Sequence, residues 1–164
     1  MSLLDLCTWL ENSPVAILMK ESLWGFPIVV TMHLMGVALS VGTLTWFDLR
    51  LVGVGFTRTP ITQVYRRVMP WAFLGFAVMA VSGGLLFVAY ATNAYRNNFF
   101  WIKMSAMALA GVNAGAYHLI TERTITSWDA SPRPPIAARL AGMTSMVLWT
   151  IVILMGRTLS YTMF

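Results

Sequence analysis

The sequence predicts an all-α integral membrane protein: a bundle of four transmembrane helices preceded by a short helix on the membrane surface. Of its 164 residues, 58% are hydrophobic and 10% are charged, whereas roughly one quarter of the residues in soluble domains are charged. The apolar residues fall in four blocks separated by short polar segments. Each block is close to the ~20 residues that cross a bilayer. The length leaves room for one domain, residues 1–164.

Residues of about 2–12 predict an interfacial amphipathic helix. Leu3, Leu6 and Leu10 recur at helical spacing, and acidic side chains occupy the opposite face. Ser2 is a plausible N-cap. The Ser13-Pro14 pair then predicts a break and a restart that leads into the first span, with serine as the cap and proline in the first turn.

Four spans follow, at about 22–47, 70–95, 99–121 and 137–160. Residues 131–135 contain three prolines, cannot be helical, and mark the loop before the fourth span. Tryptophan and tyrosine cluster near the span ends, where amphipathic rings prefer to lie. Trp149 is an exception, since it lies in the middle of the fourth span.

The distribution of lysine and arginine predicts the orientation. Seven basic residues flank the first and third loops and four lie on the other side, the first group being Arg50, Arg58, Arg66, Arg67, Arg123, Arg133 and Arg139, and the second Lys20, Arg96, Lys103 and Arg157. Basic residues favour the cytoplasmic side. We therefore expect a multi-pass protein of the bacterial inner membrane with both termini in the periplasm. The formal net charge of +5 then reflects orientation and indicates no binding to nucleic acid.

Two histidines inside predicted spans, His33 and His118, are the first functional candidates, because ionisable groups in membrane helices are costly. Both lie on faces of small residues, such as Gly36 and Gly115, which predicts that they point into the bundle. One hypothesis is a b-type haem held by both, since bundles build cofactor sites from facing helices. Close helix packing alone explains the same pattern.

Depth in the membrane argues against a haem shared by the two histidines. His33 lies 12 residues after Glu21, and His118 lies 20 residues after Asn98 on a parallel span. At the helical rise per residue, this difference places the imidazoles ~12 Å apart in depth. Haem on one histidine remains open, with Met107 near the depth of His33 as a candidate sulfur ligand.

Two further sites are candidates in the same spans. Met32, His33 and Met35 offer soft sulfur and imidazole ligands suited to Cu(I), although methionines also fill apolar cores. Asp48, Arg50 and Glu122 are expected near His118 at the cytoplasmic side. Such a polar cluster suits a quinone head or a proton relay, or is an interfacial salt-bridge network.

Several short motifs together resemble an uncharacterised family of short bacterial inner-membrane proteins, a domain-of-unknown-function family. They are Ser13-Pro14, His33-Leu34-x-Gly36, Asp48-Leu49-Arg50-Leu51, Met69-Pro70-Trp71, Lys103-Met104, His118, Trp128-Asp129 and Gly156-Arg157. The resemblance covers nearly the whole chain and implies a four-helix bundle, but no activity or ligand. The helix layout is also distantly similar to CopD-type copper-resistance membrane proteins.

These observations favour a small electron-transfer subunit, resembling a b-type cytochrome or interacting with quinone, rather than a stand-alone enzyme. One alternative is a copper-handling membrane protein, and another is a non-catalytic anchor for a periplasmic protein. The expected partners are the lipid bilayer and a periplasmic redox or metal-binding protein. A homo-oligomer is compatible with the sequence.

Overall fold

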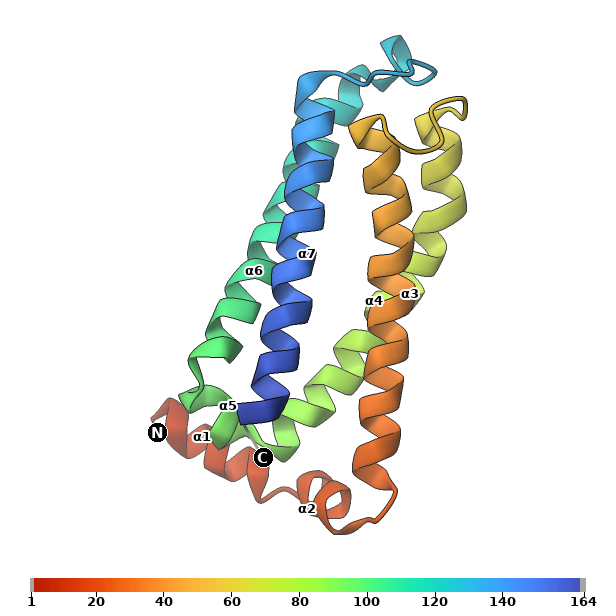
Figure 1. Cartoon of the computed structure of the whole chain (residues 1–164). Helices are drawn as coiled ribbons and strands as arrows, with labels where there is room; N and C mark the ends of the chain where they lie inside the picture. The colour runs from red at the N-terminus through yellow and green to blue at the C-terminus, as the bar shows by residue number, and fades with distance from the viewer. Residues whose placement is uncertain (1, 163–164) are drawn as a thin grey trace.

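The computed structural model describes residues 2–162, apart from the side chains of residues 121 and 122. In this part of the chain the secondary structure is entirely helical, which confirms the all-α prediction. The long helices are α3 (Gly25–Val52), α4 (Ile61–Ala89), α6 (Asn98–Ala116) and α7 (Ile136–Thr162). They run alternately in opposite directions, so both ends of the chain lie at the same end of the molecule (Figure 1).

Three of these helices, α3, α4 and α7, are long and apolar enough to cross a membrane. They expose large apolar side chains such as Leu34, Phe73 and Leu154, and an apolar surface of this kind suits lipid. Helix α6 has 19 residues and contains Lys103 and Asn113; at ~1.5 Å per residue it is slightly shorter than the ~30 Å hydrocarbon core. The helices indicate a membrane protein.

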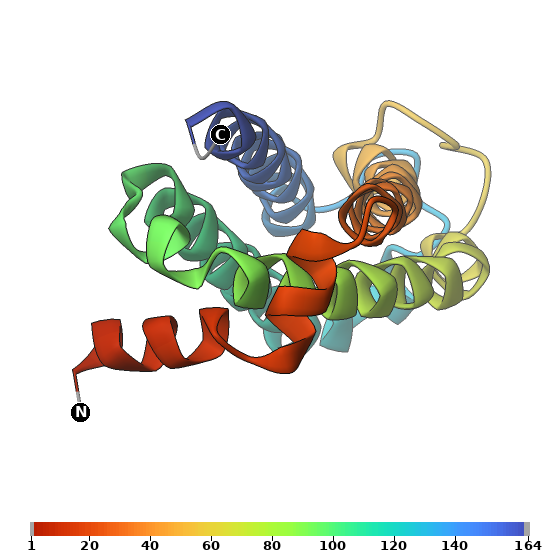
Figure 2. The same ribbon diagram turned by 90° about the horizontal axis from the view of Figure 1, so that it is seen from below.

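Two short helices precede α3 and lie across the end of the molecule that carries both termini (Figure 2). Helix α1 (Leu3–Glu11) begins with a capping box: the Ser2 hydroxyl accepts the Asp5 N–H (3.1 Å), and the Asp5 carboxylate accepts the Ser2 N–H (2.7 Å). These bonds to Ser2 lower the pKa of Asp5. Ser2 therefore caps the first helix.

Helix α2 (Pro14–Glu21) also begins as the sequence predicts, with Ser13 as its N-cap and proline in its first turn. A short break separates this helix from the first long helix, α3. Ser22 has an extended backbone that ends α2, and its hydroxyl accepts the Gly25 N–H (3.0 Å) at the start of α3. The first long helix is therefore a separate element.

The other long helices differ from the predicted spans mainly at their ends. Helix α4 begins at Ile61 rather than near residue 70, because the exposed Arg66 and Arg67 extend it beyond the apolar run. It ends at Ala89, and α5 (Ala91–Arg96) is a separate short helix. Helix α6 gives way after Ala116 to a π-helical turn, 117–121, and a 3-10 helix, 122–127.

The closest helix contact joins α3 to α4 at two glycines. A Cβ atom added to Gly36 would lie 2.7 Å from the Met79 backbone nitrogen, and one added to Gly75 would lie 2.5 Å from the Ser40 backbone nitrogen. Small residues allow helix backbones to approach in this way. This contact fixes the position of α4 against α3, and residues of both helices line the two cavities of the molecule.

The remaining contacts leave an open side. Helix α3 also packs against α7, and α7 packs against α6. In the described part of the chain, α4 and α6 do not pack along their lengths, although Phe87 of α4 stacks on Phe100 of α6 near one end (ring centroids 5.3 Å apart). Space between these two helices is therefore available for a cavity.

Arg50 joins the two loops at the end opposite the termini. The side chain is fully buried, at 0% exposure. Its Nε donates to the Thr59 carbonyl (2.7 Å), and one Nη donates to the carbonyls of Ser131 (3.1 Å) and Asp129 (3.3 Å). The Asp129 carboxylate in turn accepts the backbone N–H and hydroxyl of Thr62 (2.8 and 2.7 Å) in the first turn of α4. Arg50 is therefore a structural residue.

Replacing Arg50 with alanine is expected to lower the free energy of unfolding by about 3 kcal/mol, since three carbonyls lose a donor at ~1 kcal/mol each. Thermal unfolding followed by circular dichroism in mild detergent measures the loss. Arg133→Ala is the matched control, because Arg133 is an exposed arginine of the same loop. Equal stability of the two variants would contradict the structural role of Arg50.

Candidate functional site

His33 of α3 is held against α4 by one ring nitrogen. Its Nδ1 lies 3.1 Å from the Met79 carbonyl oxygen and 3.2 Å from the Ser82 hydroxyl oxygen. A carbonyl oxygen can only accept, so Nδ1 carries the proton and donates it. In the neutral ring the lone pair is therefore on Nε2, which has no hydrogen-bond partner among the described residues. This tautomer is the one that ligand histidines adopt.

Two neighbouring residues of α4 fix the orientation of the His33 ring. The Ser82 side chain is 2% exposed and its hydroxyl donates to the Val78 carbonyl (2.5 Å). A Cβ atom on Gly83 would lie 3.0 Å from Cε1 of His33, tighter than ordinary van der Waals contact. Glycine at this position leaves room for the ring, and the imidazole is consequently preorganised.

The His33 ring borders a cavity of about 280 Å³ between α3, α4, α6 and α7. Lys103 and Arg157 also line it, and its lining includes no acidic residue. Lys103 is half-buried and its Nζ lies over Gly156, where a Cβ atom would be 3.5 Å away. Arg157 donates to the Tyr161 hydroxyl (2.9 Å). The cavity thus combines a neutral imidazole nitrogen with a basic end.

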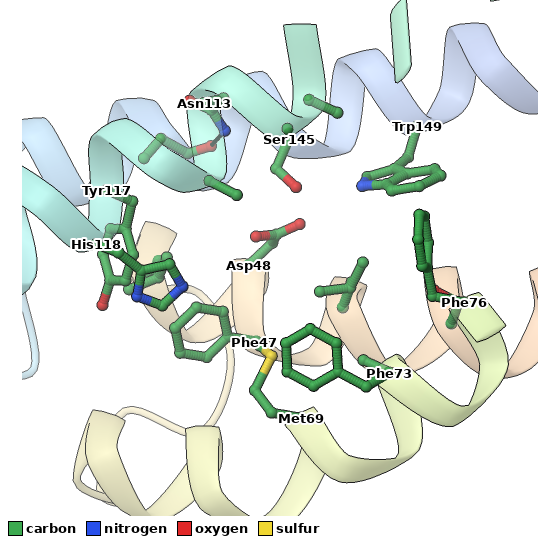
Figure 3. A pocket seen from close by; sticks show the side chains of 18 of the residues that line it. Phe47, Asp48, Met69, Phe73, Phe76, Asn113, Tyr117, His118, Ser145 and Trp149 are labelled. Carbon is green, nitrogen blue, oxygen red and sulfur yellow. Dashed lines mark hydrogen bonds between the residues drawn. The ribbon is translucent and has the colours of Figure 1, made fainter. Parts of the chain in front are cut away.

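A second cavity, of about 310 Å³, lies nearer the loop end and is bordered by Asp48. Asp48 is 4% exposed, and its carboxylate points into the cavity toward the Ser145 hydroxyl (Figure 3). No ion pair involves Asp48 in the described part of the chain. Phe47, Phe76 and Trp149 also border this space. A buried carboxylate in apolar surroundings is costly unless it finds a partner.

The expected cluster of Asp48, Arg50 and Glu122 is not assembled as predicted. Arg50 turns to the loop carbonyls, as described above, and lies away from the Asp48 cavity. The side chain of Glu122 lies outside the described residues. His118 does line the Asp48 cavity, with its ring edge-on to Tyr65 and Tyr117 at 5.8 and 5.4 Å between centroids. Asp48 and His118 therefore share a cavity without Arg50.

His33 and His118 border different cavities, and Trp149 borders both. The indole is 9% exposed and forms the wall between them. This arrangement agrees with the depth difference that the sequence predicts. It does not bring the two imidazoles to a shared ligand.

The methionines suggested as ligands are not gathered around His33. Met107 borders the Asp48 cavity and not the His33 cavity. Met32 and Met35 are 47% and 67% exposed on the outer face of α3. Among the described residues, no group of three or more His, Cys, Asp or Glu side chains is arranged to hold a metal ion. The copper set of Met32, His33 and Met35 is therefore not brought together.

Sequence reasoning missed three residues that shape the sites. Lys103 contributes to the predicted orientation only as one of the basic residues, but in the structure it lines the His33 cavity. Trp149 could have been found from the sequence, because it lies in the middle of a span whereas the other aromatic residues of this kind lie near span ends. Ser145 faces Asp48 (Figure 3), and nothing in its sequence context distinguishes it from other small residues of α7.

Comparisons with curated proteins and with solved structures found no match. A family model matches residues 9–162 and is described as "Family of unknown function (DUF6644)". The matched range includes every long helix and all residues that border the two cavities. The chain therefore belongs to this family of unknown function, DUF6644.

Proposed function

We propose that the protein is a membrane-embedded electron-transfer subunit that carries one b-type haem on His33. The observation that carries this proposal is the tautomer of the His33 imidazole. Its Nδ1–H is bound to the Met79 carbonyl (3.1 Å), and its Nε2 lone pair is free at the cavity. A histidine that donates its other N–H to a carbonyl is the usual arrangement for a metal ligand.

The basic end of the cavity supports the same ligand. A b-type haem carries two carboxylates, and Lys103 and Arg157 are the two cations that line the cavity. Charge-assisted hydrogen bonds from these side chains would hold the carboxylates, and Tyr90 lines the same space. When bound, the haem would supply one-electron redox chemistry; His33 would hold its iron, and Lys103 and Arg157 would orient the group.

The proposed site implies an arrangement in the membrane. We propose that all four long helices span the bacterial inner membrane, α6 being completed by the π-helical turn that follows it. Both termini would lie in the periplasm, which the distribution of basic residues supports. Arg157 and the His33 cavity would then lie toward the periplasmic side. A periplasmic redox protein is the partner that suits this orientation.

An optical spectrum tests the proposal directly. Protein expressed with added haem precursor and purified in mild detergent should show a Soret band that shifts on reduction with dithionite, with close to one haem per chain by pyridine haemochrome assay. The same preparation without precursor is the control for partial loading. A featureless spectrum, in protein that remains folded by circular dichroism and fails to bind added haemin, would overturn it.

A further inference from the structure

The Asp48 cavity contains a buried carboxyl group that has no counter-charge among the described residues, and the proposed haem site does not use it. Asp48 is 4% exposed, points into the cavity, and has no ion pair in the described part of the chain (Figure 3). The nearest arginine in sequence, Arg50, is occupied by loop carbonyls. The hydroxyl of Ser145 is its hydrogen-bond partner, but no cation of the described residues neutralises it. A carboxyl group kept at such a position without a counter-charge is a functional candidate by default in a membrane protein.

The surroundings of Asp48 suit a flat ring that carries hydroxyl groups. Phe47, Phe76 and Trp149 provide aromatic walls, and the polar atoms of His118 and Ser145 border the same space (Figure 3). Ligand sites usually combine apolar walls with a few polar groups that fix orientation. Here the polar groups are hydrogen-bonding side chains on three different helical segments. A ring with an oxygen on each side could bond to more than one of them.

The cavity is reached from the lipid rather than from water alone. Phe73 and Phe76 of α4 border it and are 65% and 42% exposed, and Gly111 of α6 is exposed as well. These residues lie where α4 and α6 do not pack along their lengths. A ligand that enters here must therefore be soluble in the membrane.

We propose that the Asp48 cavity binds the head ring of a membrane hydroquinone, which serves as the electron donor to the His33 site. This inference rests on the proposed function for its redox part. Asp48 accepts a hydrogen bond from one ring hydroxyl, and the rings of Phe76 and Trp149 hold the head. Trp149 borders both cavities, so donor and acceptor are separated by one side chain.

The reaction balances with ferric haem as the oxidant. One hydroquinone loses two electrons and two protons and becomes the quinone. A ferric haem bound at the His33 site would supply a one-electron acceptor, so two such acceptors would be needed per hydroquinone. Asp48 accepts the first proton and the His118 imidazole the second, and both protons then leave to water at the loop end, because proton transfer needs a base within hydrogen-bond reach.

The principal competing ligand is a lipophilic organic cation. Such a cation would pair with the Asp48 carboxylate and rest on the faces of the aromatic rings. The hydroxyl of Ser145 and the imidazole of His118 favour the hydroquinone, since a quaternary cation makes no hydrogen bonds to them. The test below therefore includes a cationic probe.

The redox test measures haem reduction by a short-chain benzohydroquinone in stopped-flow experiments. Asp48→Asn should lower the rate at least tenfold while leaving the Soret band unchanged, and Ser145→Ala should lower it by a smaller factor. Glu21→Gln is the matched acid-to-amide control, because Glu21 is exposed on α2. A wild-type rate in Asp48→Asn would overturn the inference even if the haem is present.

The binding test separates this inference from the haem proposal. In His33→Ala protein, which lacks the proposed haem ligand, the corresponding benzoquinone should still quench Trp149 fluorescence, measured as the difference from a Trp149→Phe background. Asp48→Asn should abolish that difference. Asp48-dependent quenching in parent protein that binds no haem would overturn the proposed function but support the quinone site. Asp48-dependent binding of tetraphenylphosphonium without benzoquinone binding would overturn the quinone site.

Discussion

His33→Ala is expected to abolish the Soret band of haem-loaded protein. The substitution removes Nε2, the one imidazole nitrogen that faces the basic cavity with its lone pair free. Loss of a group that only hydrogen-bonds to a metal ligand already weakens metal binding by about 10–100-fold, and loss of the ligand itself should exceed that range. Haem content after gel filtration and the absorbance spectrum measure the effect. Folding is checked by the thermal transition.

His118→Ala is the matched control for this prediction. His118 borders the Asp48 cavity and is exposed, so its loss should leave the Soret band in place. A second check uses His33→Gly, whose vacated space should accept added imidazole and regain the band. Loss of the band in His118→Ala, with its retention in His33→Ala, would assign the ligand to the other cavity and refute the site described here.

The separation of the two histidines could be predicted because it depends on local quantities. The length of an apolar run and the rise of a helix fix how deep a residue lies. His33 and His118 have different offsets from their span starts, and the structure places them at different cavities on either side of Trp149. The depth of a residue in the membrane can therefore be predicted from sequence even when the span boundaries are only approximate.

The predicted copper ligands and the predicted polar cluster do not assemble for one physical reason, the angle by which successive side chains rotate about a helix. Residues one or two positions apart do not face each other, so Met32 and Met35 point away from the cavity that His33 borders. The same rule separates Asp48 from Arg50. Depth in the membrane groups residues at one level, but the rotation of each side chain about its helix decides which of them meet.

Other features depended on tertiary contacts that one sequence does not contain. The partner of Arg50 is a set of carbonyls from two loops that meet only in the folded chain. The orientation of the His33 ring depends on a carbonyl and a glycine of α4. Such contacts join residues more than forty positions apart, for example His33 and Met79. No local sequence pattern predicts them.

Among glycine-to-alanine substitutions in the long helices, Gly75→Ala is expected to destabilise the protein most. Its Cβ would lie 2.5 Å from the Ser40 backbone nitrogen and 2.9 Å from the Gly36 carbonyl oxygen. Backbone atoms cannot rotate away as a side chain can, so α3 and α4 must separate. Overpacking typically costs about 1–3 kcal/mol, and a clash with two backbone atoms of α3 should reach at least the upper end. Thermal unfolding in detergent measures this loss.

The control is the same substitution in the same helix, Gly84→Ala, whose Cβ would meet no atom within 4 Å. Because glycine in a helix interior is about 1 kcal/mol less favourable than alanine, this variant should be as stable as the parent or more so. Separation of α3 from α4 would also move the Met79 carbonyl away from Nδ1 of His33. Any folded Gly75→Ala protein should therefore bind haem more weakly than Gly84→Ala does. Equal stability and equal haem content in the two variants would show that the glycine contact does not position the imidazole.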